Sequence, residues 1–512
     1  MSDDGKNSRG VELNGCQSCP DEKRTTLTAA DGTAVDSSTR RHVLGTLGAL
    51  SATSLAAGTG SAGSRDEPKS GAGEREPKRP APKVDGPITG GSATGEPQLS
   101  AVPNLSKYGY VEEEYFISGR AHSLESLSGG KRDDASYTTR IVVWRPAHRS
   151  TFNGTLLADW PNVSTQVDVP VTWINADDYL MREGYAVAMI SAQEVGVQDS
   201  AEEMDLVTWD PERYGDLHHP GDDYAFDIFS QAIRTLRGDS KRRKGDPDPM
   251  AGLEPKRVLA TGVSQSAGFL HSYINAVQEH LGLIDGFLPA TAGTIIDEQP
   301  VRDDVAPVLW LNSEDEADTK QRPDEGQFRL WEVAGASHVN RWLSAYVEIA
   351  LARDLEGEAI PWEPAIAGQY GELEDGVYGE CEYNYFPMRY AYRSALEHLN
   401  EWVKTGEKPT RTPKIQRADD GVARDEYGNA KGGVRLPPID VPVAEYDAMS
   451  CELFGQTHRF DEQTLSKLYP TPHKYLTKMA TATDEAVENG YLLPADAADL
   501  MRRAKDSPVG HD

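Results

Sequence analysis

Alternating hydrophobic and polar segments predict strands and helices that follow one another from about residue 101 onward. Short apolar runs, which are typical of strands buried in a sheet, occupy residues 154–158, 185–190, 257–263, 306–312 and 328–333. Alternation at 110–117 and 138–144 predicts strands with one exposed face, and helical spacing is found at 179–183, 222–236, 269–277 and 390–403. This succession predicts a mostly parallel central sheet that is flanked by helices.

The segment 257–275 is the centre of this pattern, because a strand, a run of small residues and a helix follow directly on one another. That is the context of a nucleophile elbow, in which a serine occupies a strained turn and only small residues fit two positions before and after it. Gly262 and Ser266 meet this demand around Ser264. A second frame centres on Ser266, between Ser264 and Gly268, but places the nucleophile inside the first helical turn. We therefore favour Ser264, although a non-catalytic strand-to-helix turn would also need small residues.

The last two apolar runs are each followed by residues that can complete a catalytic group. One runs into an acidic cluster with Glu314 and Glu316, and the other is followed by His338. A serine nucleophile needs a histidine to accept its proton, and the histidine needs a carboxylate to fix its tautomer. The order serine, acid, histidine is that of α/β-hydrolases and differs from chymotrypsin and subtilisin. We predict Ser264, Glu316 and His338 as the catalytic residues, with Glu314 as the competing acid.

The loop after the first apolar run is expected to complete this site. In α/β-hydrolases it supplies one backbone N–H group to the oxyanion hole, and the residue after the nucleophile supplies another. The corresponding positions are Val163 and Gln265. Trp160 and Asn162 belong to the same loop and are predicted to contact the substrate.

Several longer motifs resemble one known family. They include Asp159-Trp-Pro-Asn-Val-Ser164, Trp331-Glu-Val-Ala-Gly335 and Gly428-Asn-Ala-Lys-Gly-Gly-Val-Arg435. Together with the elbow, they make residues 100–505 similar to the alpha/beta hydrolase domain family whose elbow reads Gly-x-Ser-Gln-Ser-Gly. Ala267 stands where that elbow has its last glycine, and Glu316 stands where an aspartate is expected.

The resemblance implies an α/β-hydrolase fold with a long C-terminal extension, at about residues 390–505, and a serine hydrolase that cleaves a small-molecule carboxylic ester through an acyl-enzyme. Two alternatives stay open: an amidase or peptidase with the same machinery, and a non-catalytic secreted or surface binding protein on this scaffold. The sequence contains neither a glycine-rich phosphate loop nor a metal-ligand motif, so no cofactor and no metal ion are expected.

The N-terminal part is predicted to hold a targeting segment and a linker. Arg40 and Arg41 precede a short, weakly apolar stretch, which is typical of a twin-arginine signal, here within residues 1–63. Residues 64–100 are rich in Gly, Pro and Ser and are expected to form a disordered linker before the hydrolase domain at 101–505. We therefore expect an exported protein, extracellular or at the cell surface, whose mature form has no membrane span.

The charge of the chain restricts its partners. It has 82 acidic and 52 basic residues, a formal net charge of -30, which argues against nucleic-acid binding. Such a surface is typical of proteins adapted to high salt, where screening weakens the repulsion among carboxylates. We therefore expect an exported member of the haloarchaeal type, although an acidic mesophilic protein would have the same composition. No oligomeric state is predicted.

The four cysteines form two groups. Cys16 and Cys19 make a Cys-x-x-Cys upstream of the predicted signal, where no second pair or surrounding fold supports a metal or redox site. Cys381 and Cys451 lie in the C-terminal part of a chain expected to reach an oxidising compartment, and we predict a disulfide between them.

Overall fold

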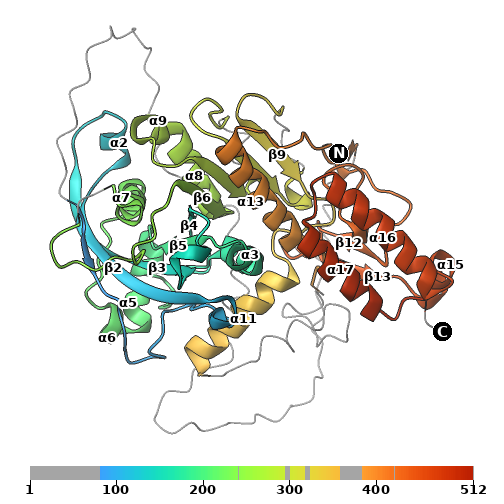
Figure 1. Cartoon of the computed structure of the whole chain (residues 1–512), viewed down its shortest axis with the longest axis horizontal. Coiled ribbons are helices and arrows are strands. Elements are labelled where there is room, and N and C mark those ends of the chain that lie inside the picture. The colour runs from blue at the N-terminus through green and yellow to red at the C-terminus, as the bar shows by residue number, and fades with distance from the viewer. Residues whose placement is uncertain are drawn as a thin grey trace, which may run out of the picture. The chain divides into compact units, whose positions relative to one another are not determined.

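Nine strands form the central sheet of the structure, a computed structural model, in the order β1-β2-β3-β5-β4-β6-β7-β8-β9 (Figure 1). The structure describes residues 81–239, 242–293, 300–317, 323–357, 383–419, 421–451 and 453–510, all within one compact unit of the chain. The strands are β1 (Lys83–Asp85), β2 (Tyr110–His122), β3 (Asp134–Pro146), β4 (Thr155–Trp160), β5 (Ala186–Ile190), β6 (Arg257–Val263), β7 (Gly286–Ala290), β8 (Val308–Asn312) and β9 (Phe328–Glu332).

The direction of the strands divides the sheet into two parts. From β5 through β4, β6, β7 and β8 to β9, neighbouring strands run parallel. At the other side, β1, β2 and β3 pair antiparallel, and β3 also pairs antiparallel with β5. The carboxyl ends of the parallel strands therefore share one edge, where loops from several strands can meet.

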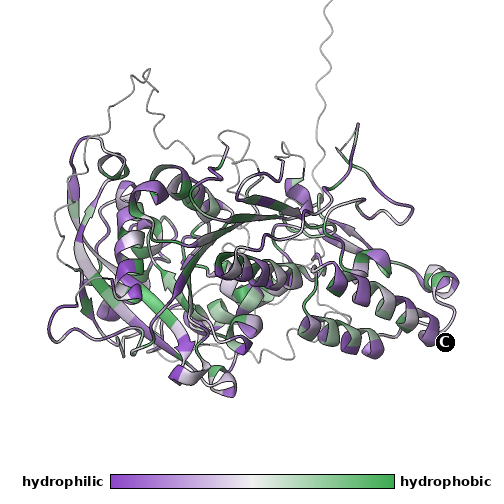
Figure 2. Cartoon of the chain, turned by 45° about the horizontal axis from the view of Figure 1, so that its top comes forward, coloured by the Kyte–Doolittle hydropathy of each residue, from purple (hydrophilic) through white to green (hydrophobic). Residues whose placement is uncertain are grey.

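Helices cover both faces of this sheet. Successive side chains of a strand point to opposite faces, so that Leu156 and Ala158 of β4 pack in one hydrophobic core and Leu157 packs in the other. The first core includes α7 (Ala225–Arg237) and α8 (Gln265–Ala276), and the second includes α3 (Val171–Arg182), α11 (Arg341–Glu356) and α13 (Met388–Thr405). Figure 2 shows that the central strands are largely hydrophobic. The predicted α/β-hydrolase fold is confirmed.

Short helices connect the main elements. They are η1 (Leu105–Tyr108), α2 (Leu124–Leu127), η2 (Arg149–Thr151), α4 (Glu194–Val197), α5 (Leu206–Trp209), α6 (Pro211–Tyr214), η3 (Asp222–Tyr224), α9 (Gln278–Leu281) and η4 (Glu314–Glu316). Two of them matter for the site, because α4 packs beside the loop after β4 and η4 follows β8 directly.

Sequence patterns missed β7 and α11 and recognised only the end of α3. β7 reads Gly-Phe-Leu-Pro-Ala, and Pro289 is unusual in a central strand because proline cannot donate to the ladder. In α11, buried residues such as Leu343, Ala345 and Leu351 point in several directions, so no single apolar stripe marks the helix.

The prediction of a disordered linker up to residue 100 is wrong from residue 81 onward. β1 pairs with β2, and the backbone N–H of Leu99 donates to Asp354 Oδ2 at 2.8 Å. Arg213 donates to the carbonyl oxygen of Gly95 at 3.0 Å. Side chains from distant elements hold this segment by its backbone, and a composition rich in Gly and Pro does not reveal such bonds. The linker residues before 81, like the predicted signal at 1–63, lie outside the described residues.

The C-terminal part does not begin as a separate extension near residue 390, because α13 is an integral layer of the fold. It packs on α3, β7 and β8 (Figure 1). Beyond it come the strand pairs β10 (Arg417–Ala418) with β11 (Gly421–Val422) and β12 (Ala444–Asp447) with β13 (Gln456–Arg459). The helices there are α14 (Pro437–Asp440), α15 (Glu462–Leu468), α16 (Pro472–Glu488) and α17 (Pro494–Asp506).

Two further expectations concern the cysteines and the membrane. Cys451 is disulfide-bonded, but Cys16, Cys19 and Cys381 lie outside the described residues, so the pairing of Cys451 with Cys381 stays a prediction. Among the helices that the structure describes, none combines the length and the apolar character needed to cross a bilayer.

Candidate active site

Ser264 occupies a strained turn between β6 and α8. Its backbone has φ 59° and ψ -120°, a region that non-glycine residues rarely adopt. A Cβ at Gly262 would lie 2.8 Å from the carbonyl oxygen of Ser266, which explains why glycine is needed there. The hydroxyl of Ser266 is buried and bonded to the backbone of Val263, accepting from its N–H at 2.9 Å and donating to its carbonyl oxygen at 3.0 Å. Ser264 is thus at the elbow, and Ser266 braces it.

The two glutamates after β8 point in different directions. Glu316 Oε1 lies 3.0 Å from His338 Nδ1, and its other oxygen accepts from the backbone N–H of Gly293. Glu314 is fully buried, accepts from the backbone N–H of Gly335 at 2.6 Å, and pairs with Arg424. Glu316 is therefore the one that touches the histidine, while Glu314 ties the two loops to the C-terminal part.

His338 is held in an electrostatic environment that favours its charged form. Burial by itself lowers the pKa of His338, but the hydrogen bond that it donates to Glu316 and the charges of Glu316 and Asp315 outweigh it, so the pKa is raised above its ordinary value. A histidine with this support is a stronger base toward a neighbouring hydroxyl group.

Asp315 is the second carboxylate whose charge acts on His338. Burial, together with the charge of Glu316, raises the pKa of Asp315 to about 7. Ligand atoms of Asp315, Glu316 and His338 all lie within 4.8 Å of one another, a spacing that a metal ion could bridge. Because the Nδ1 atom of His338 already faces Glu316, the same geometry equally serves a catalytic acid–histidine pair.

Ser264 and His338 line one cleft. It has a cavity volume of about 30 Å³ and opens to solvent, and Asn162 and Ser164 also reach it. The rest of its lining is aliphatic and comes from the loop after β4, the start of α3, the end of β6, the loop after β9 and α11: Val169, Val171, Val263, Val339, Leu343 and Val347. The cleft thus combines a serine, a histidine and an apolar wall.

The backbone around the cleft offers two N–H groups at the predicted oxyanion positions. Gln265 is the first residue of α8, and the first N–H groups of a helix have no acceptor within it. In the loop after β4, Asn162 N–H donates to Val169 and Ser164 N–H donates to Asn162 Oδ1. Within the described part of the chain, no acceptor is bonded to the N–H of Val163.

Of the two residues predicted to contact the substrate, only Asn162 lines the cleft. Its side chain joins two loops, because Nδ2 donates to the carbonyl oxygen of Val263 at 3.0 Å. Trp160, only 1% exposed, lies in the core against Phe229 and Phe269 and donates to Gln193. As the last residue of β4 it follows the alternation of that strand into the core with α7 and α8, so the prediction of a substrate contact for Trp160 is wrong.

The C-terminal part supports the loops of the site, which sequence reasoning missed. Arg424 pairs with Glu314, Arg417 donates to the carbonyl oxygen of Ala317, and Val339 N–H donates to Leu453 at 2.9 Å. Val434 pairs with Val333 next to β9. The motif at 428–435 contains Val434, but a single sequence gives no signal of where that residue packs.

Comparison with known proteins gives a family match and several low structural similarities. Residues 84–502 match a family model described as an alpha/beta hydrolase domain. No curated protein matches the sequence. Solved structures similar to parts of the chain include an alpha-beta serine hydrolase homologue from Coxiella burnetii, with 11% identity and a TM-score of 0.26 over 43% of this chain and 92% of that one. Esterase Est22 with p-nitrophenol has 10% identity and a TM-score of 0.27 over 47% and 77%.

Proposed function

Because the chain belongs to the alpha/beta hydrolase domain family, we propose that it is a serine hydrolase that cleaves carboxylic esters through an acyl-enzyme. The observation that carries this proposal is the pairing of Glu316 with His338 beside a cleft that Ser264 also lines. Ser264 is the proposed nucleophile, His338 the general base and acid, and Glu316 the residue that orients the imidazole.

In the proposed reaction, Ser264 Oγ attacks the ester carbonyl carbon while His338 Nε2 takes the hydroxyl proton. The oxygen of the tetrahedral intermediate accepts hydrogen bonds from the N–H groups of Val163 and Gln265. The intermediate then expels the alcohol, which receives its proton from His338, and the acyl group stays on Ser264. Water attacks this second ester in the same way, its proton passing to His338, and the carboxylic acid leaves.

The cleft also suggests the acyl group of the substrate. Valine and leucine side chains form its wall, and among the described residues that line it His338 is the only ionisable one. A carboxylate or ammonium group would lose its hydration here without a partner of opposite charge. We therefore propose uncharged aliphatic acyl groups.

A fluorophosphonate probe tests the nucleophile directly, because it reacts covalently with an activated serine. We expect labelling of the wild type, loss of labelling in Ser264→Ala, and retained labelling in Ser266→Ala, whose role is to brace the turn. Circular dichroism of each variant establishes that it is folded. If the folded wild type takes up no probe, the alternative of a non-catalytic binding protein on a hydrolase scaffold gains the advantage.

An amidase or peptidase would use the same catalytic residues, so a matched ester and amide are needed to distinguish it from an esterase. Initial rates on an aliphatic ester and on the amide of the same acid compare leaving groups at constant acyl group. A higher kcat/KM on the amide would reject the ester proposal and leave the serine mechanism in place.

We further propose that the protein is exported through the twin-arginine route to the cell surface or the medium, as a haloarchaeal-type protein adapted to salt. Arg40 and Arg41, in the part of the chain that the structure does not describe, and the net charge of -30 support this. Replacing both arginines by lysine should leave the folded protein inside the cell; unchanged secretion of that variant would refute the route.

A further inference from the structure

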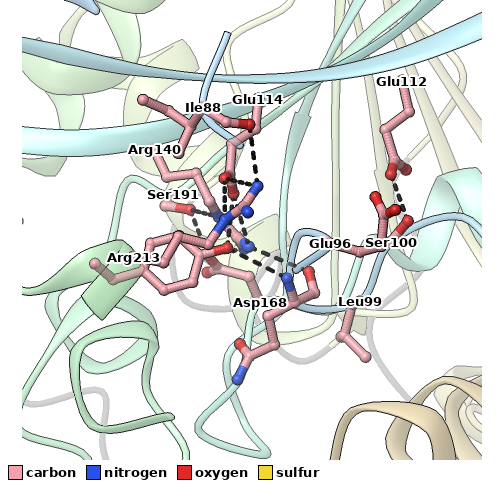
Figure 3. A network of polar contacts seen from close by, with 12 residues as sticks. Ile88, Glu96, Leu99, Ser100, Glu112, Glu114, Arg140, Asp168, Ser191 and Arg213 are labelled. Carbon is pink, nitrogen blue, oxygen red and sulfur yellow. Dashed lines mark hydrogen bonds and ion pairs between the residues drawn. The ribbon is translucent and has the colours of Figure 1, made fainter. Parts of the chain in front are cut away.

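A buried ionic network lies behind the loop that follows β4 (Figure 3). It contains two arginines and two carboxylates whose side chains are at most 1% exposed: Arg140 of β3, Arg213 of α6, Glu114 of β2 and Asp168 of the loop after β4. Buried charges are costly unless they are paired and hydrogen-bonded, so each contact restricts the position of the element that carries it.

One end of the network holds the loop. Arg140 Nη2 donates to Asp168 Oδ2 at 2.9 Å, and Ser191 Oγ donates to the same oxygen. Arg140 Nε donates to Ser191 Oγ at 3.1 Å, which closes a ring of three side chains. Asp168 is therefore fixed to β3 and to the end of β5, both of which are rigid parts of the sheet.

The other end of the network holds a different segment. Glu114 accepts from Arg213 Nε at 2.8 Å and from Tyr214 at 2.8 Å, and it lies 3.7 Å from Arg140. Arg213 in turn donates to the carbonyl oxygen of Gly95. These contacts secure the N-terminal segment, and none of the residues named here belongs to the loop after β4.

The loop transmits the position of Asp168 to Val163. Asn162 and Val169 exchange two backbone hydrogen bonds of 2.9 Å, which close the loop at its base. Val169 directly follows Asp168, and Asn162 directly precedes Val163. Within it, Gln166 N–H donates to the carbonyl oxygen of Val163 at 2.9 Å. A loop closed in this way moves as one piece when its anchor moves.

A second, independent contact comes from Gly196 of α4. A Cβ placed on Gly196 would overlap Asp168 Oδ1 and would lie 3.1 Å from Val163 Cγ1. This glycine touches both the anchor and the proposed oxyanion residue, and any side chain there would push the two away from the helix.

We propose that Arg140, Asp168 and Gly196 are positioning residues that set the backbone N–H of Val163 for the oxyanion. The inference rests on the proposed function and adds a structural origin for the oxyanion hole. Hydrogen bonds to an oxyanion depend steeply on geometry, and a shift of about 1 Å near the reacting atoms can lower a rate about 100-fold. The effect should appear in kcat, because the oxyanion forms only in the transition state.

The experiment compares variants of two carboxylates of the same network, with p-nitrophenyl butyrate as the substrate. Asp168→Asn should lower kcat about 10- to 100-fold with little change in KM. Glu114→Gln removes an equally buried charge from the other end, so it should lower the melting temperature to a similar degree and leave kcat near the wild-type value. Fluorophosphonate labelling of the wild type establishes the serine mechanism separately.

Gly196→Ala provides the same test without a change of charge. It should also lower kcat, whereas Gly215→Ala, whose Cβ would contact Pro211 and no residue of the loop, should affect stability alone. If Asp168→Asn does not fold, the comparison of Gly196→Ala with Gly215→Ala tests the inference in its place. Wild-type kcat in folded Asp168→Asn or Gly196→Ala would overturn the inference, as would equal losses of kcat in a test variant and its control. Absent labelling of the wild type would instead reject the proposed function.

Discussion

Glu316 and His338 meet through a 3.0 Å contact between Oε1 and Nδ1, although they stand on loops after different strands. The contact leaves Nε2 as the only nitrogen of His338 that can accept a proton from Ser264. Glu314, two residues earlier, is turned toward Gly335 and Arg424 instead. The two glutamates should therefore respond differently to the same substitution.

We expect Glu316→Gln to lower kcat about 10³- to 10⁴-fold without unfolding the protein, because a neutral amide cannot stabilise the imidazolium. The measurement is kcat on an aliphatic ester beside a thermal melt. Glu314→Gln is the matched control: it weakens the pair with Arg424 and should cost about 1–3 kcal/mol of stability while kcat changes little. A larger loss of kcat in Glu314→Gln would transfer the catalytic role.

The charge of Asp315 should be visible in the pH profile. His338 must be neutral to accept a proton, so kcat/KM falls as the pH drops through its pKa. Asp315 raises that pKa. Asp315→Asn should therefore move the acidic limb of kcat/KM to lower pH, with activity retained further into acid than in the wild type. An acidic limb that stays in place or moves upward would contradict this reading of the site.

Chelation should not inactivate the protein, although Asp315, Glu316 and His338 have the spacing of metal ligands. In the proposed mechanism both nitrogens of His338 are in use, one toward Glu316 and one toward Ser264, so none is free for a metal ion. Initial rates after dialysis against excess EDTA should equal those before it. Loss of activity that returns on adding a divalent cation would assign the cluster to a metal.

Val347 of α11 should limit the length of the acyl group, because its side chain is part of the apolar wall of the cleft. Val347→Ala should shift the preferred substrate from the acetyl and butyryl esters toward the octanoyl ester, and Val347→Phe should do the opposite. Ile349→Ala, on the same helix but not among the residues that line the cleft, controls for general loosening. An unchanged ratio of kcat/KM across the ester series would show that α11 does not set chain length.

The acidic surface predicts a response to salt. With a net charge of -30, repulsion among carboxylates should decrease as the Debye length falls from ~10 Å at 0.1 M salt to ~3 Å at 1 M. The melting temperature should rise over this range, and the rate should follow the folded fraction. A melting temperature that stays level or falls in sodium chloride would reject adaptation to brine and leave the hydrolase assignment intact.

Local sequence features predicted the parts of the site that depend on local geometry. The elbow was recognisable because Gly262 and Ser266 are small for a steric reason, and His338 because it closely follows a strand. The preference for Glu316 over Glu314 also rested on its distance from a strand end. The prediction failed for Trp160, which was assigned to the loop although it is the last residue of β4. Its place in the alternation of that strand directs its side chain into the core.

Contacts between distant segments could not be predicted in this way. Asp168 and Arg140 looked like ordinary charged residues of a loop and a strand, and no periodicity marks a carboxylate that will be buried. Composition predicts a linker as far as residue 100, because it carries no trace of the backbone atoms that bond to Arg213 and Asp354. Such pairings arise only when the tertiary structure brings the segments together.

The support that Arg417, Arg424 and Leu453 give to the acid and histidine loops has a consequence for biosynthesis. A nascent chain carries its nucleophile elbow well before these three residues have left the ribosome. Until they arrive, the two loops lack their bonds to the C-terminal part, at Glu314, Ala317 and Val339. For a hydrolase of the proposed kind, full activity is therefore expected only once the chain extends past Leu453, and a product terminated before that residue should cleave esters more slowly.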